Sequence, residues 1–350
     1  MKLSILNLAP LRKGQNQKDA IDALVRLAQH AENIGIKRYW IAEHHNMSNL
    51  ASSATQLLIA HVLSQTSKIC VGSGGVMLPN HSPYSIAEQY GTLQTLYPDR
   101  VELGLGRAPG TDSQTAKAIR RGGDIFGIYD FEAEISELRG YFDGTNAVKA
   151  YPANGLSVPF YILGSSTESA YLAAKLGLPY AFASHFAPRQ LALAVSIYKQ
   201  NFNPSKYLEK PYTIVGANVI IADTNEQATS LATTQTRFFL NVVTNSRDGL
   251  CPPARSDDEI FNSSKKAKNT PHFGPIRFQQ DALKERERAV VEQMTACSFI
   301  GSAKSVRDEL IEFHAKLGFD EIMAVSYIFD ENLQFASYSA LKQIVDEIKE

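Results

Sequence analysis

The sequence predicts an α/β protein that folds as a (β/α)8 TIM barrel with a long insertion late in the chain, for three reasons. Eight short β-rich runs alternate with longer segments of helical period, which is the pattern of repeated βα units and a parallel sheet. Glycine follows several helical segments shortly before the next β-rich run, where it can end a helix in the left-handed conformation. The chain has 350 residues, and such barrels commonly exceed roughly 200 residues as one domain. We therefore expect one domain over residues 1–350.

The individual elements are predicted from their periodicity. The eight predicted strands span residues 3–8, 39–43, 69–78, 101–105, 160–163, 180–183, 214–221 and 321–326. Apolar residues that recur every three or four positions predict helices at 19–34, 54–65, 86–96, 169–176 and 188–202. On the first helix the expected buried stripe comprises Ala20, Leu24, Leu27, Ala28 and Ala31. The expected helix-ending glycines are Gly35, Gly177 and Gly318.

One stretch, residues 244–285, interrupts the alternation. It is rich in Ser, Asn, Asp, Lys and Pro, and Cys251-Pro252-Pro253 and Thr270-Pro271 break regular structure within it. A long irregular loop in a compact domain is usually a mobile lid over an active site or a disordered linker. Because a predicted helix at 285–295 leads back into barrel-like sequence, we favour the lid.

Composition excludes several classes of function. Lys and Arg total 35 against 36 Asp and Glu, and no long basic run occurs, so nucleic acid is not an expected partner. No run of 18 apolar residues is present, so no membrane span is expected. The apolar residues 3–8 are followed by Pro10, Arg12 and Lys13, which indicates a first strand and not a secretion signal.

The three cysteines lie far apart and include no CxxC pair. They are Cys70, Cys251 and Cys297, and we expect them to be unpaired thiols. Their pattern argues against a disulfide framework or a zinc knuckle. The protein is therefore expected in the reducing cytoplasm.

Residues that follow barrel strands are the candidates for chemistry, because TIM barrels carry their active sites at the carboxyl ends of the strands. Glu43-His44-His45-Asn46 follows the second strand and predicts a proton-transfer site, since histidine titrates near neutral pH. Neighbouring side chains at a strand end point in opposite directions, so at most one of the two histidines should face a pocket. The pattern is not HExxH on a helix, and no metal site is expected.

Glycine-rich segments follow the third and fourth strands. Glycines within 72–75 mark either a place where a ligand lies against the backbone or a kink that closes the barrel. The later segment, 104–111, lacks the dinucleotide-binding fingerprint because Pro109 occupies the position of its third glycine. Arg107 in that segment suggests anion capture, with a surface arginine on a flexible loop as the alternative.

A hydroxyl-rich segment, Gly164-Ser165-Ser166 followed by Ser169, leads from the fifth strand into a helix. Backbone N–H groups and hydroxyls at a helix N-terminus form a phosphate site, although a simple N-cap is the common alternative. A glycine platform, an arginine and this helix start fall at the same end of neighbouring strands. Together they predict a site for an aromatic cofactor that carries a phosphate.

Four motifs in chain order resemble the bacterial luciferase-like flavin monooxygenase family. They are Trp40-Ile41-Ala42-Glu43-His44-His45, Gly72-Ser73-Gly74-Gly75-Val76-Met77-Leu78-Pro79, Gly104-Leu105-Gly106-Arg107-Ala108-Pro109-Gly110 and Leu163-Gly164-Ser165-Ser166, and Phe299-Ile300-Gly301-Ser302-Ala303-Lys304-Ser305-Val306 extends the likeness. The resemblance implies His44 as the catalytic residue. It implies that the cofactor is bound by Gly74, Gly75, Gly106, Arg107, Gly164, Ser165, Ser166 and Ser169.

The same resemblance implies a monooxygenase that uses reduced FMN, supplied by a separate flavin reductase, and O2 to form a C4a-peroxyflavin and oxygenate a small organic substrate. The light-emitting family member has a reactive cysteine immediately before the arginine, whereas Gly106 stands here, which argues against light emission. It also implies a homodimer through the helices at 54–65 and 86–96.

Three other readings stay open. The cofactor F420 would make the protein a hydride-transfer oxidoreductase on the same barrel. The chain could also be a non-catalytic flavin-binding accessory subunit, or a hydrolase that uses Glu43 and His44 without flavin.

Overall fold

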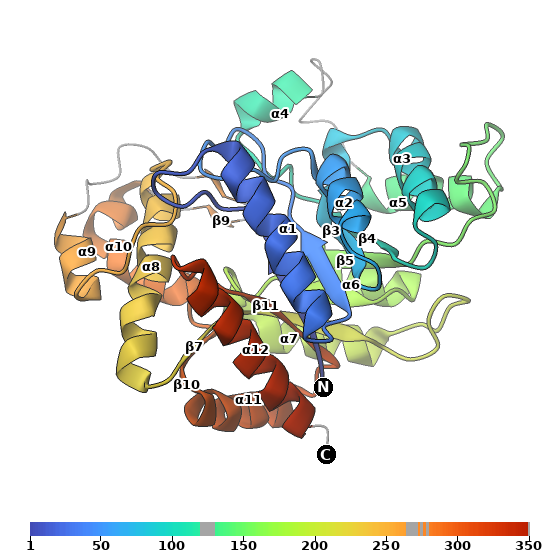
Figure 1. Cartoon of the computed structure of the whole chain (residues 1–350). Coiled ribbons are helices and arrows are strands. Elements are labelled where there is room, and N and C mark those ends of the chain that lie inside the picture. Colours follow the sequence, from blue (N-terminus) through green and yellow to red (C-terminus); the bar gives the residue numbers. More distant parts are fainter. Residues whose placement is uncertain (120–129, 264–271, 274–275, 278–279, 349–350) are drawn as a thin grey trace.

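The computed structural model describes residues 1–119, 130–263, 272–273, 276–277 and 280–348. Eight parallel strands close into a barrel in the order β1–β2–β3–β4–β5–β6–β7–β11, with β11 paired back to β1 (Figure 1). Each predicted strand overlaps one of them, so the TIM-barrel prediction is confirmed. The barrel strands are β1 (Lys2–Asn7), β2 (Arg38–Ile41), β3 (Cys70–Met77), β4 (Val101–Gly106), β5 (Phe160–Gly164), β6 (Tyr180–Phe182), β7 (Thr213–Ala222) and β11 (Glu321–Val325).

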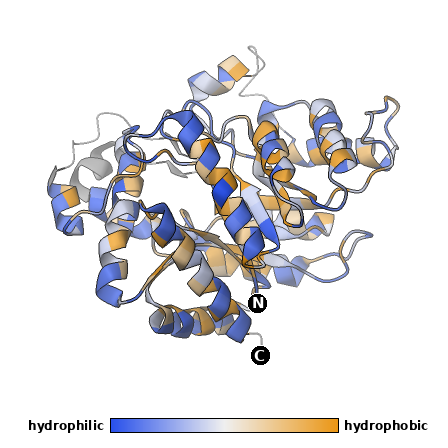
Figure 2. Ribbon diagram, in the orientation of Figure 1, coloured by the Kyte–Doolittle hydropathy of each residue, from blue (hydrophilic) through white to orange (hydrophobic). Residues whose placement is uncertain are grey.

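Helices surround the barrel, and Figure 2 shows that they carry both hydrophilic and hydrophobic residues. The predicted helices correspond to α1 (Gln17–Asn33), α2 (Thr55–Ser64), α3 (Pro83–Leu96), α6 (Thr167–Leu176), α7 (Leu191–Asn201) and α10 (Gln280–Met294). The whole predicted stripe of α1 is buried. Gly35, Gly177 and Gly318 have positive φ, as predicted. Further helices are α4 (Ser113–Ile119), α5 (Phe131–Asp143), α8 (Asn225–Thr244), α9 (Asp257–Ser263), α11 (Ala303–Leu317) and α12 (Glu331–Ile348), with 3-10 turns η1 (Leu78–Asn80) and η2 (Pro188–Gln190).

One strand that pairs with the barrel, β10 (Ser298–Ser302), is absent from the sequence prediction. Strand β7 is ten residues long, and its last part, from Asn218 to Ala222, pairs with β10. Its first part pairs with β6 and β11. The long β7 therefore extends past the end of β6. Helix α8 follows β7 and packs against both β7 and β10.

The predicted insertion, 244–285, lies partly outside the described residues. The backbone N–H of Leu250 donates to the carbonyl of Leu11 (2.8 Å), and the N–H of Lys13 donates to the carbonyl of Leu250 (2.7 Å). The hydroxyl of Thr234 on α8 donates to the carbonyl of Cys251 (2.9 Å). The start of this segment is therefore fixed to α8 and to the loop after β1. Its later described parts include α9 and the hairpin strands β8 (His272–Phe273) and β9 (Ile276–Arg277).

Buried charges occupy the end of the barrel where the strands begin. The guanidinium of Arg38, the first residue of β2, donates to Glu102 (Nε to Oε2, 2.6 Å) and to Glu321. The indole N–H of Trp40 donates to the same Glu102 oxygen (2.8 Å). These contacts lie at the opposite end from the loops that carry the predicted site.

All three cysteines are free thiols, as expected. Within the described ranges, no helix has both the length and the apolar character needed to cross a bilayer.

Candidate active site

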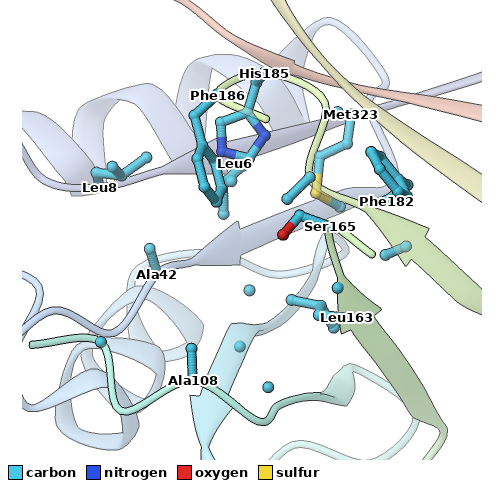
Figure 3. A pocket seen from close by; sticks show the side chains of 18 of the residues that line it. Leu6, Leu8, Ala42, Ala108, Leu163, Ser165, Phe182, His185, Phe186 and Met323 are labelled. Atoms are coloured by element: carbon cyan, nitrogen blue, oxygen red, sulfur yellow. The ribbon is translucent and has the colours of Figure 1, made fainter. Parts of the chain in front are cut away.

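A cavity opens at the carboxyl ends of the barrel strands, and every residue predicted for the site lines it. Figure 3 shows this cavity, with Ser165 among the lining residues that it labels. These residues are His44, Gly74, Gly75, Gly106, Arg107, Gly164, Ser165, Ser166 and Ser169. They come from the ends of β2, β3, β4 and β5 and from the first turn of α6. Residues predicted separately from four strand ends thus meet in one place.

The loop after β2 is organised around the carboxylate of Glu43, which is fully buried. Its Oε1 accepts hydrogen bonds from Nε2 of His45 (2.9 Å) and Nε2 of His81 (2.8 Å). Its Oε2 accepts from the backbone N–H of Met77 (3.3 Å). These bonds join the loops after β2 and β3. Glu43 does not line the cavity, so this geometry does not support a hydrolase that uses its carboxylate.

Of the two adjacent histidines, His44 and His45, only one lines the cavity, as predicted. His44 lines the cavity, whereas the ring of His45 binds Glu43. The backbone holds both residues, since the N–H of His44 donates to the carbonyl of Ser52 (3.1 Å) and the N–H of His45 donates to the carbonyl of Gly110 (3.2 Å). The doublet therefore presents one imidazole to the cavity and uses the other to fix the loop.

The electrostatics of these groups follow from burial and hydrogen bonding. Burial would raise the pKa of Glu43, but the hydrogen bonds from His45 and His81 outweigh it and lower the pKa to about 2. Burial lowers the pKa of His44 to about 4, against a smaller opposing effect of its hydrogen bond with Gly110. Glu43 is therefore ionised at neutral pH, and His44 is an uncharged imidazole.

Glycine is required in β3 by packing as well as by any ligand. A Cβ at Gly75 would lie 2.8 Å from the carbonyl oxygen of Gly104, and a Cβ at Gly74 would lie 2.5 Å from Cδ1 of Leu6. The pairing of β3 with β4 also shifts in register between Ser73 and Val76. The alternative of a strand kinked to close the barrel is thus supported, and the same two glycines expose their backbone to the cavity.

The helix that follows β5 presents an N-terminus to the cavity. Its N-cap residue, Ser166, makes no side-chain cap hydrogen bond to the helix backbone. The pKa of Glu168 is lowered chiefly because its carboxylate accepts hydrogen bonds from the Ser166 hydroxyl and from a backbone N–H, and Arg107 lowers it further. The start of α6 therefore already stabilises an anionic oxygen, that of the Glu168 carboxylate. Ser169 donates to the carbonyl of Ser166 (2.7 Å) and contacts the hydroxyl of Tyr180 (2.9 Å), so it also holds this turn in place.

Arg107 is the charged residue of the cavity lining among the described residues. It is exposed, and within the described part of the chain its guanidinium makes no hydrogen bond or salt bridge. Asn80 on η1 donates to the carbonyl of Pro109 (2.7 Å) and holds the loop that carries Arg107. A guanidinium beside a helix N-terminus has the chemistry needed to bind a phosphate.

Sequence reasoning missed a second histidine of the cavity, His185, which follows β6 and is 7% exposed. The hydroxyl of Ser184 donates to the carbonyl of Gly216 (2.5 Å), and Asn218 Nδ2 donates to the carbonyl of His185 (2.7 Å). Burial lowers the pKa of His185 to about 3, with a smaller contribution from His44. The strand-end rule applied to the sixth strand would have found it. The other missed lining residues are mainly apolar or aromatic: Leu6, Leu8, Phe182, Phe186, Ile214, Phe238, Phe239, Val242, Met323 and Tyr327.

We expect the substitution His185→Leu to make the free energy of unfolding less dependent on pH between 6.5 and 4. His44 and His185 are uncharged in the folded state, whereas each binds a proton near pH 6.5 in the unfolded chain. The unfolded state thus gains protons as the pH falls, and stability falls by about 1.4 kcal/mol per pH unit for each such histidine. The variant loses one of these two contributions.

Urea unfolding at several pH values measures this slope, and the matched control is His61→Gln, which replaces an exposed histidine. Identical slopes for His185→Leu and the wild-type protein would contradict the assignment of His185 as a buried neutral imidazole.

Comparison with known proteins is consistent with this geometry. The sequence profile described as luciferase-like monooxygenase matches residues 1–321. The chain is 41% identical over 350 residues to a luciferase-like monooxygenase of Escherichia coli strain K12, with 99% of this chain and 97% of that protein covered. It is also 41% identical over 349 residues to the uncharacterised protein YddN of Bacillus subtilis strain 168, covering 99% and 96% of the two chains.

Solved structures share the fold over nearly the whole chain. The apo-MsnO8 structure superposes with a TM-score of 0.84 at 29% identity, covering 99% of this chain and 98% of that one. The oxygenating constituent of 3,6-diketocamphane monooxygenase of Pseudomonas putida, in complex with FMN, gives 0.70 at 16%, covering 99% and 97%. An F420-dependent secondary alcohol dehydrogenase with an F420-acetone adduct gives 0.65 at 14%, covering 99% of each chain. The last two likenesses show a common fold alone.

Proposed function

Because this chain belongs to the luciferase-like monooxygenase family, we propose that it uses reduced FMN and molecular oxygen to oxygenate a small organic substrate. One observation supports a cofactor that joins a flat ring system to a phosphate. One end of the cavity is lined by Arg107 and the N-terminus of α6, which would bind an anion, and the interior beside Gly74 and Gly75 is apolar. FMN has the same division, with a phosphate at one end and a flat ring system at the other.

The residues present fit this cofactor. Arg107, the hydroxyls of Ser165 and Ser166 and the first N–H groups of α6 would hold the phosphate. Ser169 and Gly164 would shape the turn, because a Cβ at Gly164 would lie 2.0 Å from the Ser169 hydroxyl oxygen. When bound, reduced FMN supplies the electrons that activate oxygen.

His44 is the residue that we propose for proton transfer. It is the histidine of the predicted doublet that faces the cavity, and its low pKa leaves the imidazole uncharged at neutral pH. A neutral imidazole offers one N–H donor and one acceptor nitrogen. It can therefore hold or move a single proton beside the ring-binding part of the cavity.

A second candidate cofactor is F420, which would make the protein a hydride-transfer oxidoreductase. Beside the phosphate end lies a second hollow lined by Ser165, Ser166, Arg189, Gln190 and residues of α10. F420 continues beyond its phosphate into an acidic tail, and this hollow with Arg189 offers that tail a place. FMN ends at the phosphate and needs no such extension.

Equilibrium binding under anaerobic conditions tests these alternatives. We expect reduced FMN to bind more tightly than F420, and the complex, once oxygen is admitted, to release hydrogen peroxide more slowly than free reduced FMN does. Tight binding of F420 alone would overturn the monooxygenase proposal, and binding of reduced FMN with peroxide release as fast as from free reduced FMN would identify an accessory subunit. If neither compound binds, the glycine, arginine and serine motifs serve only the structure of the barrel.

The variant His44→Ala is the second arm of this experiment. We expect its FMN affinity to stay within about threefold of wild type, because His44 is not at the phosphate end. After oxygen is admitted, we expect the variant complex to release hydrogen peroxide at least about tenfold faster, because the residue proposed to control the proton is gone. The matched control is the exposed His61→Gln. An unchanged rate of peroxide release would remove His44 from the chemistry.

We also propose a separate flavin reductase as the source of reduced FMN and a homodimer formed through α2 and α3. The dimer is supported by exposed apolar side chains on these helices, since Leu57 is 72% and Leu96 63% exposed.

A further inference from the structure

The cavity has two halves that come from opposite arcs of the barrel. The residues proposed for the cofactor lie on β2 to β5 and at the start of α6. The remaining lining comes from β6, β7, β11, β1 and α8, which form the other arc in the sheet order. Figure 3 shows this division, with Ala42, Ala108 and Leu163 on one side and Leu6 and His185 on the other. The second arc is therefore free for a substrate beside the cofactor.

The side chains that line this second half are apolar, except for the imidazole of His185 and the hydroxyl of Tyr327. Phe238 and Phe239 on α8 pack against Tyr327, with the rings of Phe238 and Tyr327 stacked at 4.5 Å. Ile214 and Met323 complete this wall. Among the described residues that line the cavity, no Asp, Glu or Lys occurs, and Arg107 belongs to the other half. A charged substrate group placed here would lose its hydration without gaining an opposite charge.

His185 is the titratable side chain with a ring nitrogen in this apolar wall. Its Nδ1 is buried and has no hydrogen-bond partner among the described residues, and a Cβ on Gly216 would lie 2.5 Å from it. The ring packs edge-on to Phe186 with centroids 5.0 Å apart, and Figure 3 shows it directed into the cavity. The hydroxyl of the preceding Ser184 donates to Gly216 on β7, and the side-chain amide of Asn218 on β7 donates to the carbonyl of His185. The protein thus holds a neutral imidazole in an apolar wall, where its Nδ1 bonds to no other described residue.

We propose that this second half of the cavity binds a neutral, largely apolar substrate with one carbonyl or hydroxyl oxygen, and that His185 binds this oxygen and sets its position. The inference rests on the proposed function, because it assumes that the first half holds the cofactor. It adds the class of substrate and a positioning residue. Because the side chains of Ser184 and Asn218 tie the backbone at His185 to β7, a substrate bound to its imidazole would be presented to the cofactor half in one orientation.

The fluorescence of Trp40 provides a direct measurement of ligand binding in the cavity. It is the only tryptophan of the chain, and its side chain lines the cavity. Its fluorescence therefore reports occupancy without any turnover. We would titrate the full-length protein with four probes of matched chain length: heptan-2-one, hept-1-ene, heptanoate and heptylammonium. Heptan-2-one should change the fluorescence in a saturable way, and heptanoate and heptylammonium should bind at least about tenfold more weakly.

Two variants separate the role of His185 from general packing. His185→Leu should weaken heptan-2-one about fivefold while leaving hept-1-ene unchanged, because only the ketone loses a hydrogen bond. His185→Gln keeps a donor and an acceptor and should restore part of the ketone affinity. FMN binding should be the same in all three proteins, which also shows that the variants are folded.

Three outcomes would overturn the inference: no saturable change with heptan-2-one, charged probes that bind as well as the ketone, or a His185→Leu variant that binds the ketone like wild type. Failure of the proposed function gives a different result, since FMN then does not bind whatever the probes do.

Discussion

Replacement of Arg107 by alanine is expected to weaken FMN binding about a hundredfold and to leave riboflavin binding within about threefold of wild type. The guanidinium lines the cavity beside the N-terminus of α6 and makes no hydrogen bond or salt bridge within the described residues. A bidentate hydrogen bond from a guanidinium to a phosphate is among the stronger polar contacts that proteins make. Riboflavin has the same ring but no phosphate, so its affinity should not depend on the guanidinium.

Isothermal titration with both compounds measures the effect. Arg107→Lys keeps the charge without the planar fork and should lose only part of the affinity. Arg189→Ala is the matched control, because this arginine is also exposed but lies in the neighbouring hollow. It should leave FMN unaffected and weaken F420 if that hollow holds the tail of F420. Equal losses of FMN and riboflavin in Arg107→Ala would refute the phosphate assignment.

The barrel was predictable because its signals are local. Each barrel strand is a short run of its own, and glycines such as Gly177 and Gly318 end the preceding helix within a few residues. Helix α8 was not predicted, since Thr229, Thr233 and Thr234 give its first half a low helical propensity. It is helical because its apolar residues are buried over the barrel. Strand β10 was missed because its pairing with β7 joins segments about 80 residues apart, which no local pattern reports.

The candidate site was likewise predictable only in part. His44 was found because an acid and two histidines adjoin in the sequence, and Arg107 because it stands among glycines. His185 has no such neighbours. The groups that hold it, Gly216 and Asn218, are about 30 residues away and meet it only because β6 and β7 pair. The residues of the cofactor half could thus be predicted from motifs, whereas the arrangement of the substrate half depends on contacts that form only when the barrel closes.

Replacement of Arg38 by leucine is expected to cost about 3–5 kcal/mol of unfolding free energy, because it leaves two buried carboxylates without their cation. Arg38 is 15% exposed at its side chain, and Glu102 and Glu321 are 9% and 2% exposed. The hydroxyls of Tyr161 and Tyr212 also donate to these acids, at 3.2 and 2.5 Å, but they supply no positive charge. Arg38→Lys keeps the charge without the fork and should lose less.

The matched control for Arg38 is Arg26→Ala, because Arg26 also binds a carboxylate through two nitrogens but lies on the surface with 48% of its side chain exposed. Removal of such an exposed pair should cost less than about 1 kcal/mol. Urea unfolding measures both losses. Since Trp40 donates to Glu102, its fluorescence in the folded state should also change in Arg38→Leu and not in Arg26→Ala. Equal losses in the two variants would mean that the amino end of the barrel, where Glu102 and Glu321 are buried, does not depend on Arg38 for its stability.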